Sequence, residues 1–216
     1  MKGDTDLERL ERQAWRKFYD DGLFDIFLGT MLAMMPVASM IETWLPNELS
    51  RMAVLVAVYA GLVLAFTLLR RGIVRPRLGT IKPTRERRRK VHGTTLVLAG
   101  SVLLGLLVWA VTALRGAGNT DFVDYIPLVF LLNATVVFAA MAYLLDVPRF
   151  YAYGPLFGMS IVVLEYSRTL LDIKIPVFVA FGLPALIIVG VGVYKLVRFL
   201  RDYPVRDPGT AIHENG

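Results

Sequence analysis

The sequence predicts an all-α integral membrane protein, a six-transmembrane-helix bundle with an interfacial amphipathic helix before the first span. Three observations carry this prediction. Six apolar runs of 18 to 21 residues divide the 216-residue chain, and a helix needs roughly 20 apolar residues to cross the hydrocarbon core of a bilayer. Hydrophobic residues make up 56% of the chain and charged residues only 19%, which lies outside the usual soluble composition. Lys and Arg fall almost entirely on alternate connections between the runs.

Two other fold classes are disfavoured by the pattern within the runs. Helices that cover the core of a soluble protein show polar stripes to water, and most of these runs have none. Strands of a membrane β-barrel alternate between apolar and polar residues, and this alternation is missing from stretches such as LVLAGSVLLGLLVWAVTAL. The runs are therefore predicted to be membrane-spanning helices.

The apolar runs organise the chain into three parts. A cytoplasmic or interfacial segment, 1–22, precedes a transmembrane domain, 23–194, and a cytoplasmic tail, 195–216, follows it. The spans are expected at 23–41, 52–69, 94–114, 125–145, 151–171 and 175–194, and the largest polar connection is the basic cytoplasmic loop 70–93. Four Pro and Gly residues argue against one continuous helix through this loop, whereas TRERRRKV, 84–91, favours a short helix that runs into the third span.

The segment 6–20, DLERLERQAWRKFYD, predicts the amphipathic helix. Leu7, Leu10, Ala14, Trp15 and Phe18 recur at three- and four-residue spacing, and charged residues fill most of the other positions. This pattern is typical of a helix that lies on the inner leaflet with its aromatic residues at headgroup depth. The alternative is a soluble helix that packs on the cytoplasmic loop.

The distribution of basic residues predicts that both termini lie in the cytoplasm. With the N-terminus inside, 20 of the 24 Lys and Arg residues are cytoplasmic, while Arg51, Arg115 and Lys174 lie outside and Arg168 lies within the fifth span. Basic residues near span ends are retained on the cytoplasmic side. We therefore expect a multi-pass protein of the cell (inner or plasma) membrane. The net charge of +6 follows from the same rule, so no nucleic-acid partner is expected.

The basic loop is the strongest candidate for a partner site. Each Lys or Arg near an anionic inner leaflet contributes about 1 kcal/mol to lipid binding, and the cluster Arg85, Arg87, Arg88, Arg89 and Lys90 is therefore expected to contact anionic headgroups. The alternative is that these residues only set the topology. The loop, with PRLGTIK inside it and an apolar hairpin before it, resembles a pattern found in small uncharacterised prokaryotic inner-membrane proteins. The resemblance covers residues 70–90 and the first hairpin, and implies no particular activity.

Charged residues within spans usually face the bundle interior, form pairs or serve function. Glu165 and Arg168 share one face of the fifth span at i, i+3 spacing. They are either a structural ion pair or part of a cation or proton site, to which Asn133 and Tyr59 at comparable depth would contribute. Asp25 lies roughly 5 Å beyond the entrance of the first span. It is expected to reach interfacial water and to favour the helix N-terminus electrostatically, or else to join the polar cluster.

Small residues predict close helix contacts. Ala53, Ala57, Gly61 and Ala65 recur every four residues along the second span, so another helix of the bundle or of a second protomer can approach closely there. Shorter versions are the pair Gly154 and Gly158 and the pair Ser101 and Gly105. Lys17–Gly22 (KFYDDG) resembles Arg149–Gly154 (RFYAYG), as an internal repeat would, but chance similarity of two membrane entrances is the favoured explanation.

No motif specifies a reaction. The chain has no cysteine, its two histidines lie outside the spans, and it contains no P-loop, G-x-S-x-G or H-E-x-x-H pattern. We therefore expect no cofactor, no metal and no enzymatic activity. The leading hypothesis is a non-enzymatic accessory, regulatory or scaffold component that acts through helix packing and the basic loop, as a homo-oligomer or with a membrane-protein partner. The alternative is a small permease or channel for a cation, proton or small solute that uses the intramembrane Glu, Arg and Asn residues.

Overall fold

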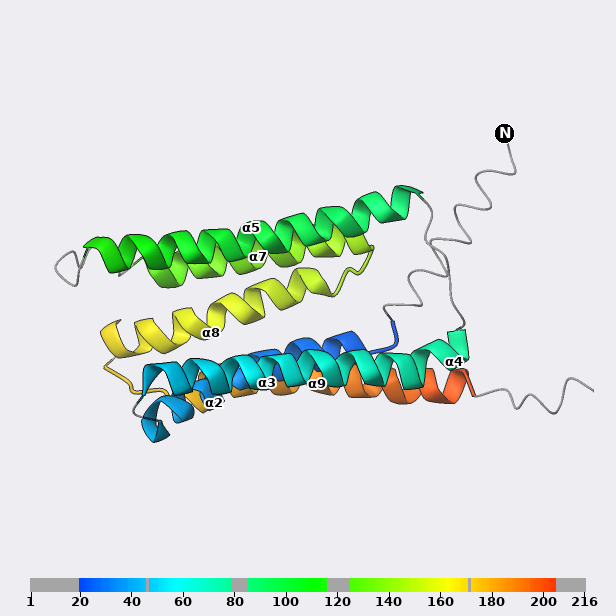
Figure 1. The fold of residues 1–216 in the computed structure, drawn as a ribbon, viewed down its shortest axis with the longest axis horizontal. Coiled ribbons are helices and arrows are strands. Elements are labelled where there is room, and N and C mark those ends of the chain that lie inside the picture. The colour runs from blue at the N-terminus through cyan, green and yellow to red at the C-terminus, as the bar shows by residue number, and fades with distance from the viewer. Residues whose placement is uncertain (1–19, 46, 79–84, 116–124, 171, 205–216) are drawn as a thin grey trace, which may run out of the picture. The chain divides into compact units, whose positions relative to one another are not determined.

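A computed structural model describes residues 20–45, 47–78, 85–115, 125–170 and 172–204. All regular structure in these residues is helical (Figure 1). The chain divides into two compact units. The first holds residues 1–82 and 187–216, and the second holds residues 83–186. The N-terminal segment predicted to be amphipathic lies outside the described residues, apart from Asp20.

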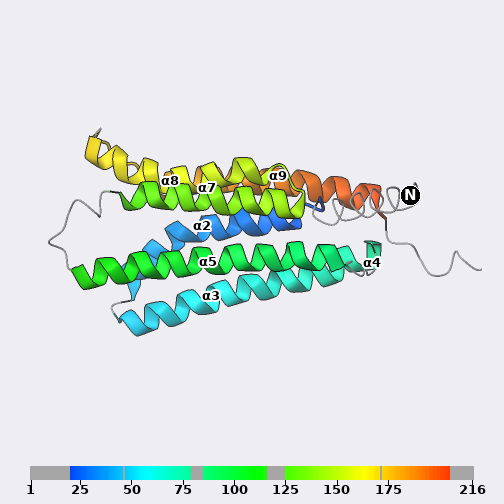
Figure 2. The same ribbon diagram turned by 90° about the horizontal axis from the view of Figure 1, so that it is seen from above.

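The described residues of the two units form six long helices, one short helix and a π-helical turn. The first unit contains α2 (Leu23–Trp44), α3 (Glu48–Leu69), a π-helical turn η1 (Arg70–Val74), α4 (Arg75–Leu78) and the last part of α9 (Val177–Asp202). The second unit contains α5 (Arg85–Arg115), α7 (Ile126–Leu145), α8 (Phe150–Leu170) and the first part of α9 (Figure 2).

Five helices in the described part of the chain are long and apolar enough to cross a membrane. They are Leu23–Ile41 in α2, Glu48–Val74 in α3 and η1, Arg89–Val108 in α5, all of α7, and all of α9. The exception is α8, which has 21 residues but carries Glu165 and Arg168 as well as several Tyr, Gly and Ser residues. The helical membrane class predicted from the sequence is thus supported by five of the six predicted spans.

The helices extend beyond the predicted spans. The loop predicted at 70–93 is helical at both ends, because α3 continues through η1 into α4 and because α5 begins at Arg85. Pro76 lies within this continuous stretch, two residues after the π-helical turn. At the other end of the chain, α9 continues eight residues past the predicted span end at Tyr194. A helix ends where its backbone hydrogen bonding ends, and this point need not coincide with the edge of the hydrocarbon.

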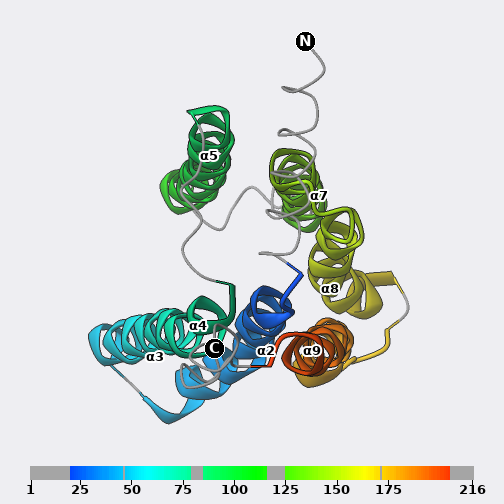
Figure 3. The same cartoon turned by 90° about the vertical axis from the view of Figure 1, so that its right-hand side faces the viewer.

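The first unit is joined where the start of α2 meets the ends of η1 and α9. Leu23, Val74 and Phe199 form a buried cluster with partly buried neighbours from α3 and α9. The ring of Phe66 in α3 also packs against Phe27, with a centroid distance of 4.6 Å. Figure 3, a view along the helices, shows α2 between α3 and α9. Three chain segments that are far apart in the sequence therefore share one small apolar centre.

Glycine allows α2 and α9 to touch at backbone distance. Gly22 precedes α2 in the left-handed region, with φ of 75°, which favours glycine. A Cβ there would lie 2.2 Å from the Gly192 carbonyl oxygen, and a Cβ at Gly192 would lie 2.7 Å from the Ile26 nitrogen. Neither position tolerates a side chain without displacement of the other helix.

The second unit uses the same device between α7 and α8. A Cβ at Gly154 would lie 2.9 Å from the Thr135 Cα, and one at Gly158 would lie 2.6 Å from the Leu131 Cα. The small-residue spacing at these two glycines therefore marks a real helix contact. Phe138 fills the space beside it, with its ring 4.9 Å from that of Phe157.

The glycine contact between α2 and α9 predicts a large difference between two glycines of one helix. Gly192→Ala should lower the free energy of unfolding by about 1–3 kcal/mol, because the methyl group forces the two backbones apart. The measurement is reversible unfolding in mixed micelles. Gly190→Ala is the matched control, since a Cβ there has no neighbour within 4 Å. Equal stability of the two variants would contradict the contact.

Candidate functional sites

The basic ends of the helices gather in each unit. In the first unit, the buried cluster brings together the start of α2, the Arg-rich turn η1 and the end of α9, which carries Lys195, Arg198 and Arg201. In the second unit, Lys90 near the start of α5 forms an ion pair of 3.7 Å with Asp146, which follows the end of α7. Within each unit, this is the arrangement that the alternation of basic connections predicts.

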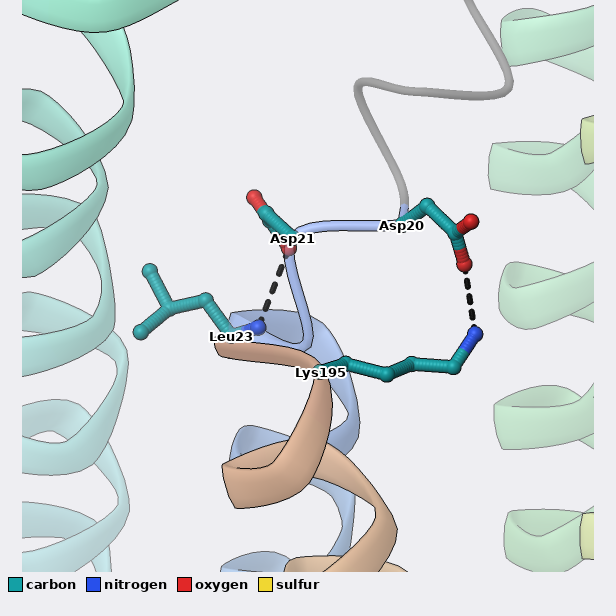
Figure 4. A network of polar contacts seen from close by, with 4 residues as sticks. All are labelled: Asp20, Asp21, Leu23 and Lys195. Atoms are coloured by element: carbon teal, nitrogen blue, oxygen red, sulfur yellow. Dashed lines mark hydrogen bonds and ion pairs between the residues drawn. The ribbon is translucent and has the colours of Figure 1, made fainter. Parts of the chain in front are cut away.

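Two aspartates, Asp20 and Asp21, mark the entrance of α2 (Figure 4). The Asp20 carboxylate accepts a hydrogen bond from Lys195 Nζ at 2.5 Å, which ties the chain before α2 to α9. The Asp21 carboxylate accepts a hydrogen bond from the Leu23 backbone N–H at 3.0 Å and is 1% exposed. Negative charge at a helix N-terminus is favourable because the unpaired N–H groups there carry partial positive charge.

Asp25 is fully buried, with 0% exposure. The expectation that this side chain reaches interfacial water is therefore wrong. Depth along the helix was the basis of that expectation, but exposure depends on what packs around the side chain, which depth along the helix does not reveal. Asp21 was not singled out from the sequence, although the DDG pattern before an apolar run was the available signal.

Glu165 and Arg168 do not form the structural ion pair that their spacing suggested. Both side chains are exposed, and the described part of the second unit shows no ion pair between them. The i, i+3 spacing places two side chains on one face but does not make them meet. Because α8 ends at Leu170, Glu165 lies about 8 Å from its end at 1.5 Å per residue. Arg168 stands in the last turn, where a cation is favourable.

Asn133 has a partner on a different helix from the one expected. Its Nδ2 donates a hydrogen bond to Ser101 Oγ at 2.9 Å, which joins α7 to α5. It also borders an apolar groove of about 320 Å³ between these helices, beside Gly105 and Phe130. Asn133 and Ser101 are therefore an interhelical pair, while Glu165 remains exposed on α8.

The remaining members of the predicted polar cluster belong to the first unit. Tyr59 is partly buried on α3, and Asp25 is buried on α2. Glu165, Arg168 and Asn133 belong to the second unit. The structure thus assembles no five-residue polar site within either unit. In the described part of the chain, no three His, Cys, Asp or Glu side chains lie close enough to hold a metal ion.

The small-residue face of α3 is uncovered. Ala53, Ala57, Gly61 and Ala65 are all exposed, and no residue of α3 is buried. A Cβ added at Gly61 would have no neighbour within 4 Å. This glycine differs in that respect from Gly22, Gly154 and Gly192, which pack against backbone. The predicted helix contact at this face is not made within the first unit.

The predicted lipid-binding cluster is only partly described. Arg85, Arg87 and Arg88 lie in the first turn of α5, but their side chains are outside the description. Arg89 is exposed, and Lys90 is engaged by Asp146. The backbone of the cluster is therefore helical rather than an irregular loop, and Lys90, one of the two cations whose side chains are described, already has an acidic partner.

Comparisons of the chain with protein-family models, with curated proteins and with solved structures find no match.

The Asn133–Ser101 hydrogen bond predicts measurable coupling between α5 and α7. In a double-mutant cycle, Asn133→Leu and Ser101→Ala should show an interaction energy of about 0.6 kcal/mol, typical of hydrogen bonds between membrane helices. The readout is the free energy of unfolding in mixed micelles. Thr95→Ala is the control partner, because its hydroxyl bonds only to the Val91 carbonyl of its own helix. Coupling of the same size with Thr95 would show that the bond between the helices is not its source.

Proposed function

We propose that this protein is a six-span component of the cell membrane with both termini in the cytoplasm. Five helices fit a membrane span, and α8 is about 32 Å long at 1.5 Å per residue, which matches a hydrocarbon core of about 30 Å. An even number of spans returns the chain to the side on which it started. The excess of basic residues on alternate connections, 20 against three, supports the cytoplasmic assignment of that side.

We further propose that the protein is non-enzymatic and acts as an accessory or scaffold component that binds another transmembrane helix. One observation carries this proposal: the face of α3 formed by Ala53, Ala57, Gly61 and Ala65 is uncovered. Elsewhere in the described residues, Gly154, Gly158 and Gly192 lie where helices pack at backbone distance. In lipid, such faces stabilise association because they allow close approach and extensive van der Waals contact.

The basic end of α5 supplies the second part of the proposed function. Arg89 is exposed next to three further arginines of the same helix turn. At an anionic leaflet these residues attract acidic headgroups or an acidic partner segment. The helix face and the basic turn would together hold the protein in an assembly at the inner leaflet.

The transport hypothesis has less support. A transport site for a cation requires polar groups that converge on a path. In the second unit, Asn133 is bonded to Ser101, and Glu165 is exposed near the end of α8. Neither residue points to a shared site, so we do not propose transport as the function.

The α3 face can be tested by cross-linking, because the natural chain contains no cysteine. Gly61→Cys should give a disulfide-linked adduct in oxidised native membranes, since a small-residue contact brings Cβ atoms to the roughly 3.8 Å that a disulfide requires. An adduct of twice the monomer mass identifies a second copy as the partner, and any other mass identifies a different membrane protein.

The matched control for this experiment is Val63→Cys, which is also exposed but lies about 200° around the helix from Gly61. It should give several-fold less adduct. Gly61→Leu in a chain tagged for co-purification should lose the partner. The proposal fails if Gly61→Cys gives no more adduct than Val63→Cys.

If the basic turn of α5 binds anionic lipid or a partner, removal of its positive charges should weaken that binding. Replacement of Arg87, Arg88 and Arg89 by Gln should weaken anionic-lipid binding by about 3 kcal/mol, roughly a hundred-fold. Anionic lipid and partners that co-purify with the protein are the readout. The control replaces Arg51, Arg115 and Lys174, three cations assigned to the outer side. An equal effect of both triple variants would contradict a dedicated role for α5.

A further inference from the structure

A hollow of about 280 Å³ lies in the first unit beside the end of α9. Lys195, Arg198 and Asp202 line it from α9, and Asp20 lines it from the chain before α2. The α9 residues recur at three- and four-residue spacing and therefore share one face of that helix. The α3 face and the basic turn of α5, on which the proposed function rests, do not line this hollow.

The charges in the hollow balance. Lys195 pairs with Asp20 at 2.5 Å, and Arg198 Nε lies 3.5 Å from a carboxylate oxygen of Asp202. Both pairs retain access to solvent, since the Asp20 side chain is 55% exposed and the Arg198 side chain 71% exposed. The charged residues among the described lining, two cations and two carboxylates, carry no net charge, so this lining complements a dipolar group better than a purely anionic one.

An aromatic wall completes the hollow. Phe199 is buried, and Tyr203 packs against it with ring centroids 5.3 Å apart. Aromatic faces attract cations through the ring quadrupole. This wall therefore lies next to Asp202, the carboxylate farthest along α9, and both features favour a positively charged group at this end.

The hollow lies at headgroup depth when α9 spans the membrane. The 26 residues of α9 extend about 39 Å at 1.5 Å per residue, whereas the hydrocarbon core is about 30 Å thick. If Val177 stands at one edge of the hydrocarbon, the last six residues or so extend past the other edge. Lys195 and Arg198 then lie near the edge, and Asp202 lies farther out.

We propose that this hollow binds the headgroup of a phospholipid that carries a primary ammonium group, such as phosphatidylethanolamine. The phosphate contacts Lys195 and Arg198, and the ammonium group donates hydrogen bonds to Asp202 beside the aromatic wall. The order along the helix matches the lipid, because the phosphate is attached next to the glycerol and the ammonium group lies beyond it. The inference rests on membrane insertion of α9 and is independent of the α3 contact.

Two related headgroups fit the hollow less well. A glycerol headgroup can donate hydroxyl hydrogen bonds to Asp202, but it has no cation, so these bonds lack the charge of an ammonium donor. A choline headgroup has a cation but no N–H, so it cannot donate a hydrogen bond to a carboxylate. The carboxylate at Asp202 is therefore the group that selects a primary ammonium.

The test is native mass spectrometry of the purified full-length protein, titrated with phosphatidylethanolamine, phosphatidylcholine and phosphatidylglycerol that have identical acyl chains. Phosphatidylethanolamine should bind about three- to ten-fold more tightly than the other two lipids. This difference in affinity is what a partly exposed charge-assisted hydrogen bond provides. Asp202→Asn should remove this preference, and Arg198→Gln should weaken binding of all three lipids, because it removes a phosphate contact.

Matched controls are Asp172→Asn, an exposed carboxylate of the second unit, and Arg201→Gln, an exposed cation of α9 outside the hollow. Both should bind the three lipids as the natural chain does. The proposal is overturned if phosphatidylglycerol binds best, if Asp202→Asn keeps the preference, or if free phosphoethanolamine binds as tightly as the lipid.

Discussion

Helices surrounded by lipid gain little from hiding apolar side chains, so close backbone packing must hold them together. This constraint explains the placement of four glycines in the two units. Gly22 and Gly192 bring α2 and α9 to backbone distance, and Gly154 and Gly158 do the same for α8 against α7. Each contact is supported by a nearby aromatic or aliphatic cluster. The architecture within each unit follows from these contacts more than from burial of large side chains.

The ends of the helices are organised by charge. Asp20 with Lys195 in the first unit and Lys90 with Asp146 in the second each join segments that are distant in the sequence. Exposed ion pairs contribute little free energy in water. Their placement is nevertheless informative, because it puts helix ends that are rich in Lys and Arg next to carboxylates that limit the local repulsion. The aspartates before α2 also compensate the partial positive charge of its N-terminus.

The sequence predicted the helical membrane class and the approximate position of every long helix, because hydrophobic length is a property of the chain alone. It also identified Gly154 and Gly158 as contact residues. Three expectations about the predicted sites depended on side-chain contacts that periodicity does not give. Asp25 is buried, Glu165 and Arg168 share a face of α8 without meeting, and Asn133 bonds to Ser101 of α5. Periodicity places a residue on a face but does not identify what covers that face.

The π-helical turn Arg70–Val74 at the end of α3 has a consequence for how this chain tolerates change in length. Such a turn holds one residue more than a regular α-helical turn. Deletion of one residue of this turn before Val74 would restore the ordinary winding, and every later residue would keep its angular position on the helix. Val74, which is fully buried against Leu23 and Phe199, would therefore stay in the apolar centre. Homologous chains are thus expected to tolerate the loss of one residue here, whereas a deletion in the regular part of α3 would rotate Val74 by about 100°.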